Sequence, residues 1–287
     1  MRAPRGAAGR PLPSPLFDAH VHLMPERLAH AVWRYFDQHL WRVRYQLPVD
    51  ELVATLRAET GVTGFVFMNY AHRAAVAQSL NRWNAELAAR IPGAVPLATF
   101  HPDDADLERL VEEAWGALGL AGAKLHCQVG RFAPDDPRLD PVYERAVALR
   151  KPIVLHVGRA PEPSPFCGAE RFAALMRRFP DLRAIVAHMG ADEFEAFFAL
   201  ARQYEHVYLD TTLVYADLLD WRPRLELVAK LQDRVLFGSD FPAIPYPVCH
   251  AIAAWLALGL GRDAEQKIFW GNAARLYGLA PEQAATR

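Results

Sequence analysis

Short apolar runs rich in β-branched residues alternate along the chain with longer segments in which apolar residues recur every three or four positions. The short runs predict strands, and the longer segments predict helices. The predicted strands lie at residues 16–22, 64–70, 94–101, 121–129, 152–158, 182–190, 206–212 and 234–242. After the first, consecutive strands start roughly 24 to 31 residues apart, which is the length of a strand-helix unit rather than of a hairpin.

Eight strand-helix units are the number that closes a (β/α)8 barrel, whereas open doubly wound sheets more often stop at five to seven strands. We therefore expect an α/β protein with the TIM-barrel fold. A long excursion, from Pro25 to Gly61, separates the first two strands and holds more than one helix. It is either a lid over the active face or a helix packed on the rim of the barrel.

The 287 residues are enough for one large barrel domain, which we expect to span residues 16–279. Residues 1–15 include prolines and arginines but no continuous apolar stretch, so we expect a flexible N-terminal segment there. We also expect a short tail at 280–287. Hydrophobic residues make up 52% of the chain and charged residues 23%, which is typical of a globular protein.

Charge and cysteine content exclude several classes of function. Lys and Arg number 32 against 33 Asp and Glu, with no basic stripe, so nucleic acid is not an expected partner. No segment is long and apolar enough to predict a membrane span. Three widely spaced cysteines predict neither disulfides nor a thiolate metal site and fit the cytoplasm. The aromatic residues around Trp33 and Trp41 allow a homodimer contact, although they fit a buried core equally well.

Ionisable side chains fall at the carboxyl ends of the predicted strands. Side chains two residues apart in a strand face the same side, so Asp18, His20 and His22 are expected to project together. The other members of this set are Lys124, His126, His156, His188 and Asp240. Active sites of barrels lie at this end, so we expect these groups to converge on one pocket that binds a small-molecule substrate. Imidazole and carboxylate donors suit a divalent transition metal.

The sequence resembles the amidohydrolase superfamily, in particular its amidohydrolase-related branch of metal-dependent hydrolases and decarboxylases. The resemblance rests on five segments in this order: DAHVH (18–22), LHVG (155–158), AHMG (187–190), FGSDFP (237–242) and IFWGNAARLYGL (268–279). It implies that His20, His22 and His156 are metal ligands and that Asp240 lies beside the metal and its bound water. It also implies that His188 acts on the substrate or bound water, or ligates a second metal.

Lys124 has two interpretations under this resemblance. A carbamylated lysine at this strand bridges two metals in some members of the superfamily, whereas an ordinary ammonium would bind a substrate anion. We expect one ion rather than two, with Zn²⁺ preferred and Mn²⁺ or Fe²⁺ also compatible. Further candidates for substrate binding are His126, Arg159 and His101, because they lie at predicted strand ends or in the loops that follow.

The leading functional hypothesis is hydrolysis of an ester, lactone or amide-type bond by metal-activated water. Asp240 would act as general base and His188 would stabilise the developing oxyanion. The alternative is a metal-dependent non-oxidative decarboxylase of an unsaturated or aromatic acid, because the same branch contains both chemistries. A third possibility, a metal-binding barrel without activity, predicts a missing ligand, and each expected ligand is present.

Overall fold

The computed structural model describes residues 12–159 and 161–279. Most of the expected N-terminal segment, and the whole of the expected tail at 280–287, lie outside these described residues. Leu12, the first residue described, packs half-buried against the main hydrophobic cluster.

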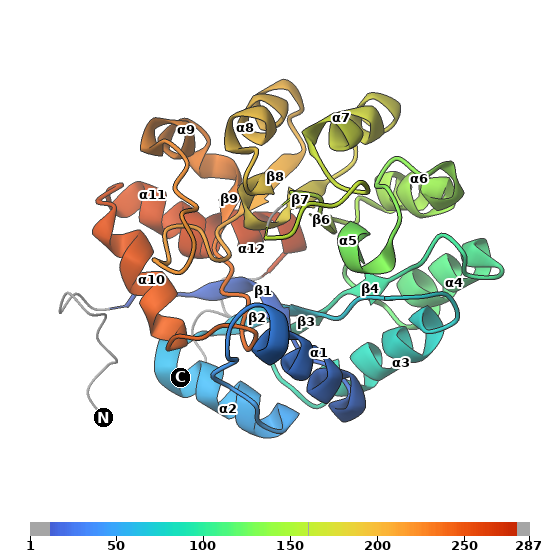
Figure 1. Ribbon diagram of the computed structural model, residues 1–287, viewed down its shortest axis with the longest axis horizontal. Helices are drawn as coiled ribbons and strands as arrows, with labels where there is room; N and C mark the ends of the chain where they lie inside the picture. The colour runs from blue at the N-terminus through green and yellow to red at the C-terminus, as the bar shows by residue number, and fades with distance from the viewer. Residues whose placement is uncertain (1–11, 160, 280–287) are drawn as a thin grey trace.

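Parallel strands form the centre of the molecule and are ordered as they occur in the sequence (Figure 1). One group pairs in the order β1-β2-β3 and the other in the order β4-β5-β6-β7-β8-β9. The strands are β1 (Phe17–His22), β2 (Gly64–Met68), β3 (Ala94–Pro96), β4 (Ala98–Thr99), β5 (Ala123–His126), β6 (Ile153–His156), β7 (Ala184–Val186), β8 (Val207–Asp210) and β9 (Val235–Leu236).

Backbone hydrogen bonds join the two groups of strands into one ring. β3 and β4 are two pieces of the third predicted strand, interrupted at Leu97, whose N–H donates to the Phe67 carbonyl at 3.1 Å. At the other junction, the Ala19 N–H donates to the Phe237 carbonyl at 2.8 Å, and Val21 bridges in parallel to Phe241. The expected (β/α)8 barrel is therefore confirmed.

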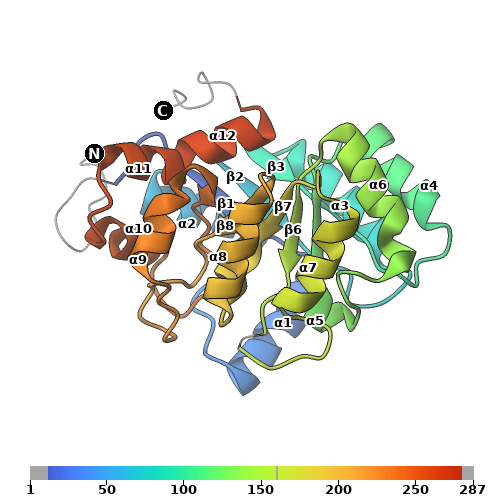
Figure 2. The same ribbon diagram turned by 90° about the horizontal axis from the view of Figure 1, so that it is seen from above.

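The helices surround the barrel (Figure 2). They are α1 (Glu26–His39), α2 (Val49–Thr60), α3 (Ala77–Ala88), α4 (Leu107–Glu112), α5 (Cys127–Gly130), α6 (Asp140–Leu149), α7 (Ala169–Arg178), α8 (Phe194–Gln203), α9 (Leu225–Lys230), α10 (Val248–Ala257), α11 (Arg262–Gln266) and α12 (Asn272–Tyr277). π-helical turns occupy Glu113–Ala117 and Lys267–Gly271, and 3₁₀ turns occupy Pro137–Leu139, Ala187–Gly190 and Gln232–Arg234. None of the described helices has the length and apolar character of a membrane-spanning segment.

Side-chain alternation along the strands produces two cores. The inner core fills the barrel with residues such as Val66, Val154 and Ile185, and α12 adds Ala273 and Leu276. The larger outer cluster packs the opposite strand faces against the helices. Toward the carboxyl ends of the strands, the side chains that point into the barrel are polar. The apolar inner core therefore ends below a polar mouth at this end of the barrel.

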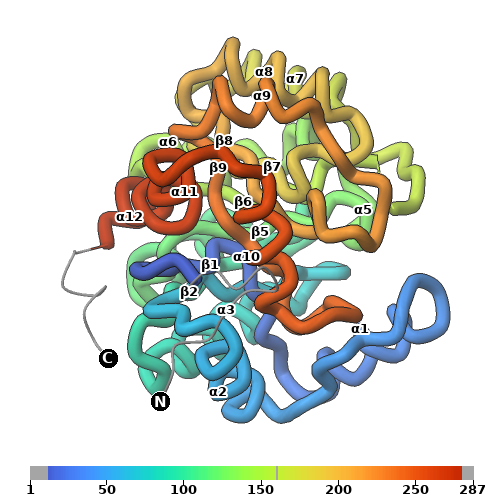
Figure 3. Tube along the Cα trace, turned by 90° about the vertical axis from the view of Figure 1, so that its left-hand side faces the viewer, coloured from blue at the N-terminus to red at the C-terminus, as the bar shows by residue number. Residues whose placement is uncertain are grey.

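The excursion between β1 and β2 forms α1 and α2. Helix α2 packs against α10 on the outside of the barrel. Helix α1 projects from the body of the molecule at the end opposite α12 (Figure 3). Its apolar face lines the cavity described below, so of the two expected arrangements the structure favours a cover over the mouth.

Candidate active site

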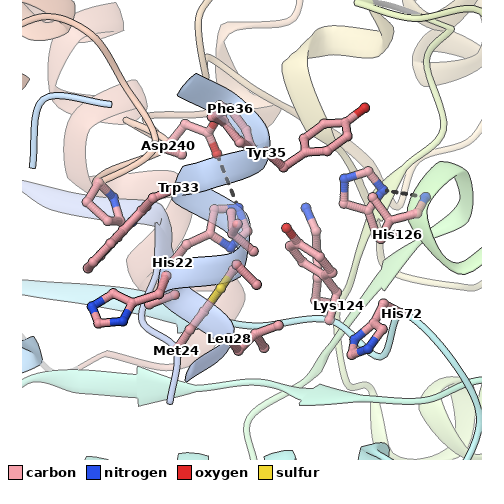
Figure 4. Close-up of a pocket in the computed structure, with 18 of the residues that line it drawn as sticks. His22, Met24, Leu28, Trp33, Tyr35, Phe36, His72, Lys124, His126 and Asp240 are labelled. Carbon is pink, nitrogen blue, oxygen red and sulfur yellow. Dashed lines mark hydrogen bonds and ion pairs between the residues drawn. The ribbon is translucent and has the colours of Figure 1, made fainter. Parts of the chain in front are cut away.

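A cavity of about 1010 Å³ opens at the carboxyl ends of the strands. Six of the predicted site residues line it: His22, Lys124, His126, His156, His188 and Asp240. Figure 4 shows His22, Lys124 and Asp240 directed toward the same space, with residues of α1 around them. The convergence predicted from strand ends is thus present in the structure.

Three donor atoms lie close together at the base of this cavity. His20 Nε2 is 3.2 Å from His22 Nε2, and Asp240 Oδ1 is 3.2 Å from His22 Nε2 and 3.5 Å from His20 Nε2. Each of the three residues is buried, and their ligand atoms all lie within 4.8 Å of one another. This is the spacing expected of groups that share one metal ion.

Hydrogen bonds to the other ring nitrogens fix the tautomers of both histidines. The Asp210 carboxylate accepts from His20 Nδ1 at 2.7 Å, and the Met68 carbonyl accepts from His22 Nδ1 at 3.2 Å. Each Nε2 therefore carries a lone pair, and the two lone pairs face each other and the Asp240 carboxylate. Buried acceptors in this arrangement need a cation between them, so the donor set fits a divalent metal.

The electrostatics of the site keep these ligands in their binding forms. Burial, together with the nearby Lys124, lowers the pKa of His20 to about 4, so its imidazole is neutral. Burial alone would raise the pKa of Asp240, but its contacts with His22 and the neighbouring histidines outweigh this effect and lower the pKa below its usual value. Neutral imidazole and ionised carboxylate are the forms that bind transition metals.

Local backbone geometry positions two of these side chains. His188 and Asp240 have φ angles of 55° and 63°, in the left-handed region that non-glycine residues rarely occupy. Such conformations cluster at functional sites. Gly238 is required nearby, because a Cβ at this position would lie 2.7 Å from the Cβ of His20. The segment FGSDFP thus turns closely past β1 and presents its aspartate to the histidines.

The other two predicted histidines lie beside this cluster. The His188 ring centre is 5.8 Å from that of His20 and 4.9 Å from that of His156. His188 Nδ1 donates to the Thr212 carbonyl at 3.2 Å, which leaves its Nε2 as an acceptor. His156 stacks on His126 with ring centres 4.0 Å apart. Their roles as ligands or substrate contacts stay predictions.

Lys124 is 1% exposed, and its Nζ lies 3.3 Å from His20 Nε2. Burial lowers the pKa of Lys124 to about 8, although the negative charges of Asp210 and Asp240 partly oppose this shift. At neutral pH this side chain is therefore mostly an ammonium, and it lines the same cavity as His22 and Asp240.

The three further candidates for substrate binding are placed differently. His126 lines the cavity, and its Nδ1 accepts from the Val129 N–H at 3.4 Å. The structure does not bring His101 there, because its Nε2 pairs with the Gly130 carbonyl at 3.0 Å and its Nδ1 accepts from the Asp103 N–H. Arg159 lines a separate surface pocket, half-exposed and 3.7 Å from Glu193. Residues that follow a strand end can turn away from the cavity, to the surface as Arg159 does or into the protein as the buried His101 does, and the alternation of side chains along a strand does not predict this.

Sequence reasoning missed Asp210, which organises the site from the end of β8. One of its oxygens holds His20, and the other accepts from the His188 N–H at 2.8 Å and from Thr212. Its position at a strand end in HVYLDTT carried the same signal as the other residues. Asp18 also differs from expectation: β1 shifts register between Asp18 and Val21, and Asp18 accepts from the Ser239 N–H rather than lining the cavity.

A closed barrel with histidine and aspartate donors at its carboxyl-terminal mouth defines a metal-dependent TIM-barrel enzyme. The sequence profile described as amidohydrolase matches residues 17–279. The chain therefore belongs to the amidohydrolase family and is an enzyme of that superfamily. No curated relative matches the sequence.

Three solved structures illustrate the neighbourhood of this fold. An uncharacterized TIM-barrel protein from Bordetella bronchiseptica has a TM-score of 0.71 and 20% identity, over 94% of this chain and 100% of that one. 2,6-Dihydroxybenzoate decarboxylase complexed with 2,6-dihydroxybenzoate has a TM-score of 0.68 and 19% identity, over 93% of this chain and 100% of that one. The third is a variant of 5-carboxyvanillate decarboxylase from Novosphingobium aromaticivorans with bound manganese and 3-methoxy-4-hydroxy-5-nitrobenzoic acid. It has a TM-score of 0.68 and 15% identity, over 97% of this chain and 100% of that one. At these identities the likeness establishes the fold.

Proposed function

We propose that the protein is a metal-dependent, non-oxidative decarboxylase of an aromatic or unsaturated carboxylic acid. The observation that carries this proposal is the buried Lys124 side chain, which lies beside the three-donor cluster and lines a cavity with largely apolar and aromatic walls. Two of the structural neighbours are decarboxylases of hydroxylated benzoates, which favours the same chemistry. This reverses the order of the two sequence-based hypotheses.

The cavity suits a planar acid. Tyr70, Trp33 and Trp221 line it and are each more than nine-tenths buried, so they offer rigid aromatic surface to a ring. Lys124 supplies the positive charge that a carboxylate needs after it leaves water. Since Arg159 faces another pocket, Lys124 rather than Arg159 takes this role.

Decarboxylation breaks the bond between the carboxylate carbon and the ring carbon and releases CO₂. The electron pair left on the ring carbon then takes a proton. His188 is a poor donor because its Nδ1–H is held by the Thr212 carbonyl and its Nε2 has a lone pair. Lys124 Nζ has N–H bonds to donate and lines the cavity, so it is the better general acid, and it regains its proton from water.

We propose that His20, His22 and Asp240 hold one divalent transition metal, with His156 and His188 as further contacts. When bound, the metal supplies positive charge that polarises the substrate oxygens. The manganese in one neighbour and the imidazole-carboxylate donor set make Mn²⁺ and Zn²⁺ the two ions to test.

Hydrolysis of an ester, lactone or amide-type bond is the second candidate function. The position of Asp240 favours it, because its carboxylate lies at the donor cluster, where a general base for an attacking water would act. Asp240 is needed under both hypotheses, whereas an acid at Lys124 is needed only for decarboxylation.

The test incubates metal-loaded protein in D₂O with a panel of hydroxybenzoates, unsaturated acids, esters and lactones. Decarboxylation predicts CO₂ release and one deuterium on the ring carbon. Lys124→Met should lower this rate by about 10²–10⁴-fold, the usual contribution of a general acid. Lys230→Met, at an exposed position on α9, is the matched control. Ester or lactone cleavage without CO₂ release, unaffected by Lys124→Met, would refute the proposal in favour of hydrolysis.

A further inference from the structure

The cavity is larger than the donor cluster requires, and many of the residues that line it belong to the excursion between β1 and β2. Pockets that enclose drug-sized ligands typically measure about 300–1,000 Å³. A volume of about 1010 Å³ is at the upper end of this range, more than a single-ring acid would fill. Besides the polar residues at the strand ends, the lining includes apolar side chains of α1, α2, α3 and the connection between α1 and α2.

The apolar face of α1 forms one wall of this extra space. Leu28, Val32 and Phe36 recur at helical spacing and line the cavity, as does the buried Trp33. Figure 4 shows Leu28, Trp33 and Phe36 of this set. Leu28, Val32 and Phe36 are only half-buried, although they face inward. An apolar face that remains partly in contact with water forgoes the free energy that covering it would provide.

The other walls also carry apolar side chains, beside the polar Gln46 and Arg90. Leu47, Val49 and Leu52, around the start of α2, line the same cavity, and so does Trp83 of α3. We call the space bounded by Leu28, Val32, Leu47, Val49, Leu52 and Trp83 the α1 chamber. It shares one cavity with His22, Lys124 and Asp240, so a single ligand can reach both parts.

Polar contacts around the carboxyl end of α1 tie the excursion to the barrel. The Tyr35 hydroxyl donates to Glu162, across the mouth in the loop after β6, at 2.9 Å. Beyond the end of α1, Trp41 Nε1 donates to the Ala243 carbonyl at 2.8 Å, and the Arg44 N–H donates to the Ile244 carbonyl at 2.9 Å. The helix is therefore tied to two loops of the barrel mouth.

We propose that the α1 chamber binds an apolar substituent of the substrate, so that the acid that the enzyme acts on carries an alkyl chain or a second ring. This inference rests on the proposed function for the carboxylate end of the ligand. The α1 chamber selects the apolar end of the ligand, because the binding free energy grows with the carbon surface that the chamber buries. Leu28 and Val32 are specificity-determining residues, because they contribute apolar surface without any group that could take part in the reaction.

The experiment measures dissociation constants for benzoate and for benzoates with ethyl, butyl and hexyl chains at the 3- or 4-position. Quenching of tryptophan fluorescence in metal-loaded protein provides the signal, since Trp33, Trp41, Trp83 and Trp221 line the cavity. In at least one of the two series, affinity should rise about fourfold for each buried methylene, equivalent to about 0.8 kcal/mol. Affinity that is constant or falls with chain length in both series would overturn the proposal.

Two variants assign the effect to the α1 chamber. Leu28→Gln and Val32→Gln should each flatten the dependence on chain length, because an amide in the wall must lose its water when the chain binds. Arg34→Gln, on the exposed face of α1, should keep the full dependence. A dependence that is unchanged in both chamber variants would refute the assignment.

The outcome separates this inference from the proposed function. Rising affinity with chain length, but no CO₂ release from any acid, would support the α1 chamber and refute the decarboxylase. CO₂ release from short acids, with no gain in affinity from longer chains, would support the decarboxylase and refute the α1 chamber.

Discussion

Replacing Asp210 with asparagine tests the claim that this residue prepares His20 for metal binding. One carboxylate oxygen accepts from the His188 N–H at 2.8 Å and from the N–H and hydroxyl of Thr212. In the variant, these three donors will bind the one carbonyl oxygen of the asparagine side chain, because it takes the place of the carboxylate oxygen that they bind now. The new NH₂ group then faces His20 Nδ1 in place of the oxygen that is now 2.7 Å away. His20 must shift its proton to Nε2, the atom that we assign to the metal.

The magnitude follows from the lost contact. A hydrogen bond to a charged group contributes about 1.5–3 kcal/mol. Loss of a carboxylate that orients a metal-bound histidine typically lowers metal affinity by about 10–100-fold. We therefore expect Asp210→Asn to weaken Mn²⁺ or Zn²⁺ binding by this factor, measured by competition with a chelator of known affinity. The substitution conserves volume, so circular dichroism should show a folded barrel.

Asp103→Asn, at an exposed carboxylate, is the control and should bind metal as the natural protein does. Unchanged metal affinity in folded Asp210→Asn would show that His20 does not need this partner. The tautomer argument, and with it the assignment of His20 Nε2 as a ligand atom, would then be wrong.

Four further predictions follow from the same structure. Asp240→Asn should abolish turnover of any substrate while the protein stays folded, and retained turnover would exclude Asp240 from the reaction. Stripping the metal with a chelator should lower thermal stability, since a ligand at about 100 times its Kd adds about 2.7 kcal/mol to the free energy of unfolding; an unchanged melting temperature would argue against a bound ion. Asn84→Ala removes an amide that donates to Asn69 and the Leu97 carbonyl, and should cost about 1–3 kcal/mol of stability in denaturant unfolding. Trp41→Phe removes the hydrogen bond to Ala243 and should lower the free energy of unfolding by about 1 kcal/mol. A free energy of unfolding equal to that of the natural protein would contradict this prediction.

The sequence predicted the barrel and most of the donor cluster because both follow from simple periodicities. Recurring strand-helix units determine the ring of strands. Alternation along each strand places His20, His22, Lys124 and His156 on the inner side. The predicted strands were too long, since residues 127–129 begin α5 and residues 187–190 form a 3₁₀ turn. Apolar residues continue into these turns, so hydrophobicity alone does not mark where the strand ends.

The parts that depend on loop conformation were beyond such reasoning. His101 pairs with the Gly130 carbonyl, and Arg159 turns toward Glu193, although both follow predicted strands as the true cavity residues do. The α1 chamber is likewise a tertiary feature. The amphipathic pattern of α1 predicts a face that needs apolar neighbours, but not that a cavity lies beneath it.

The most direct measurement is anomalous diffraction from crystals of the metal-loaded protein, recorded at the absorption edge of the added ion. The account predicts an anomalous peak within about 2.0–2.2 Å of His20 Nε2, His22 Nε2 and Asp240 Oδ1. An empty position between these atoms at saturating metal, or an ion bound elsewhere in the barrel, would contradict it.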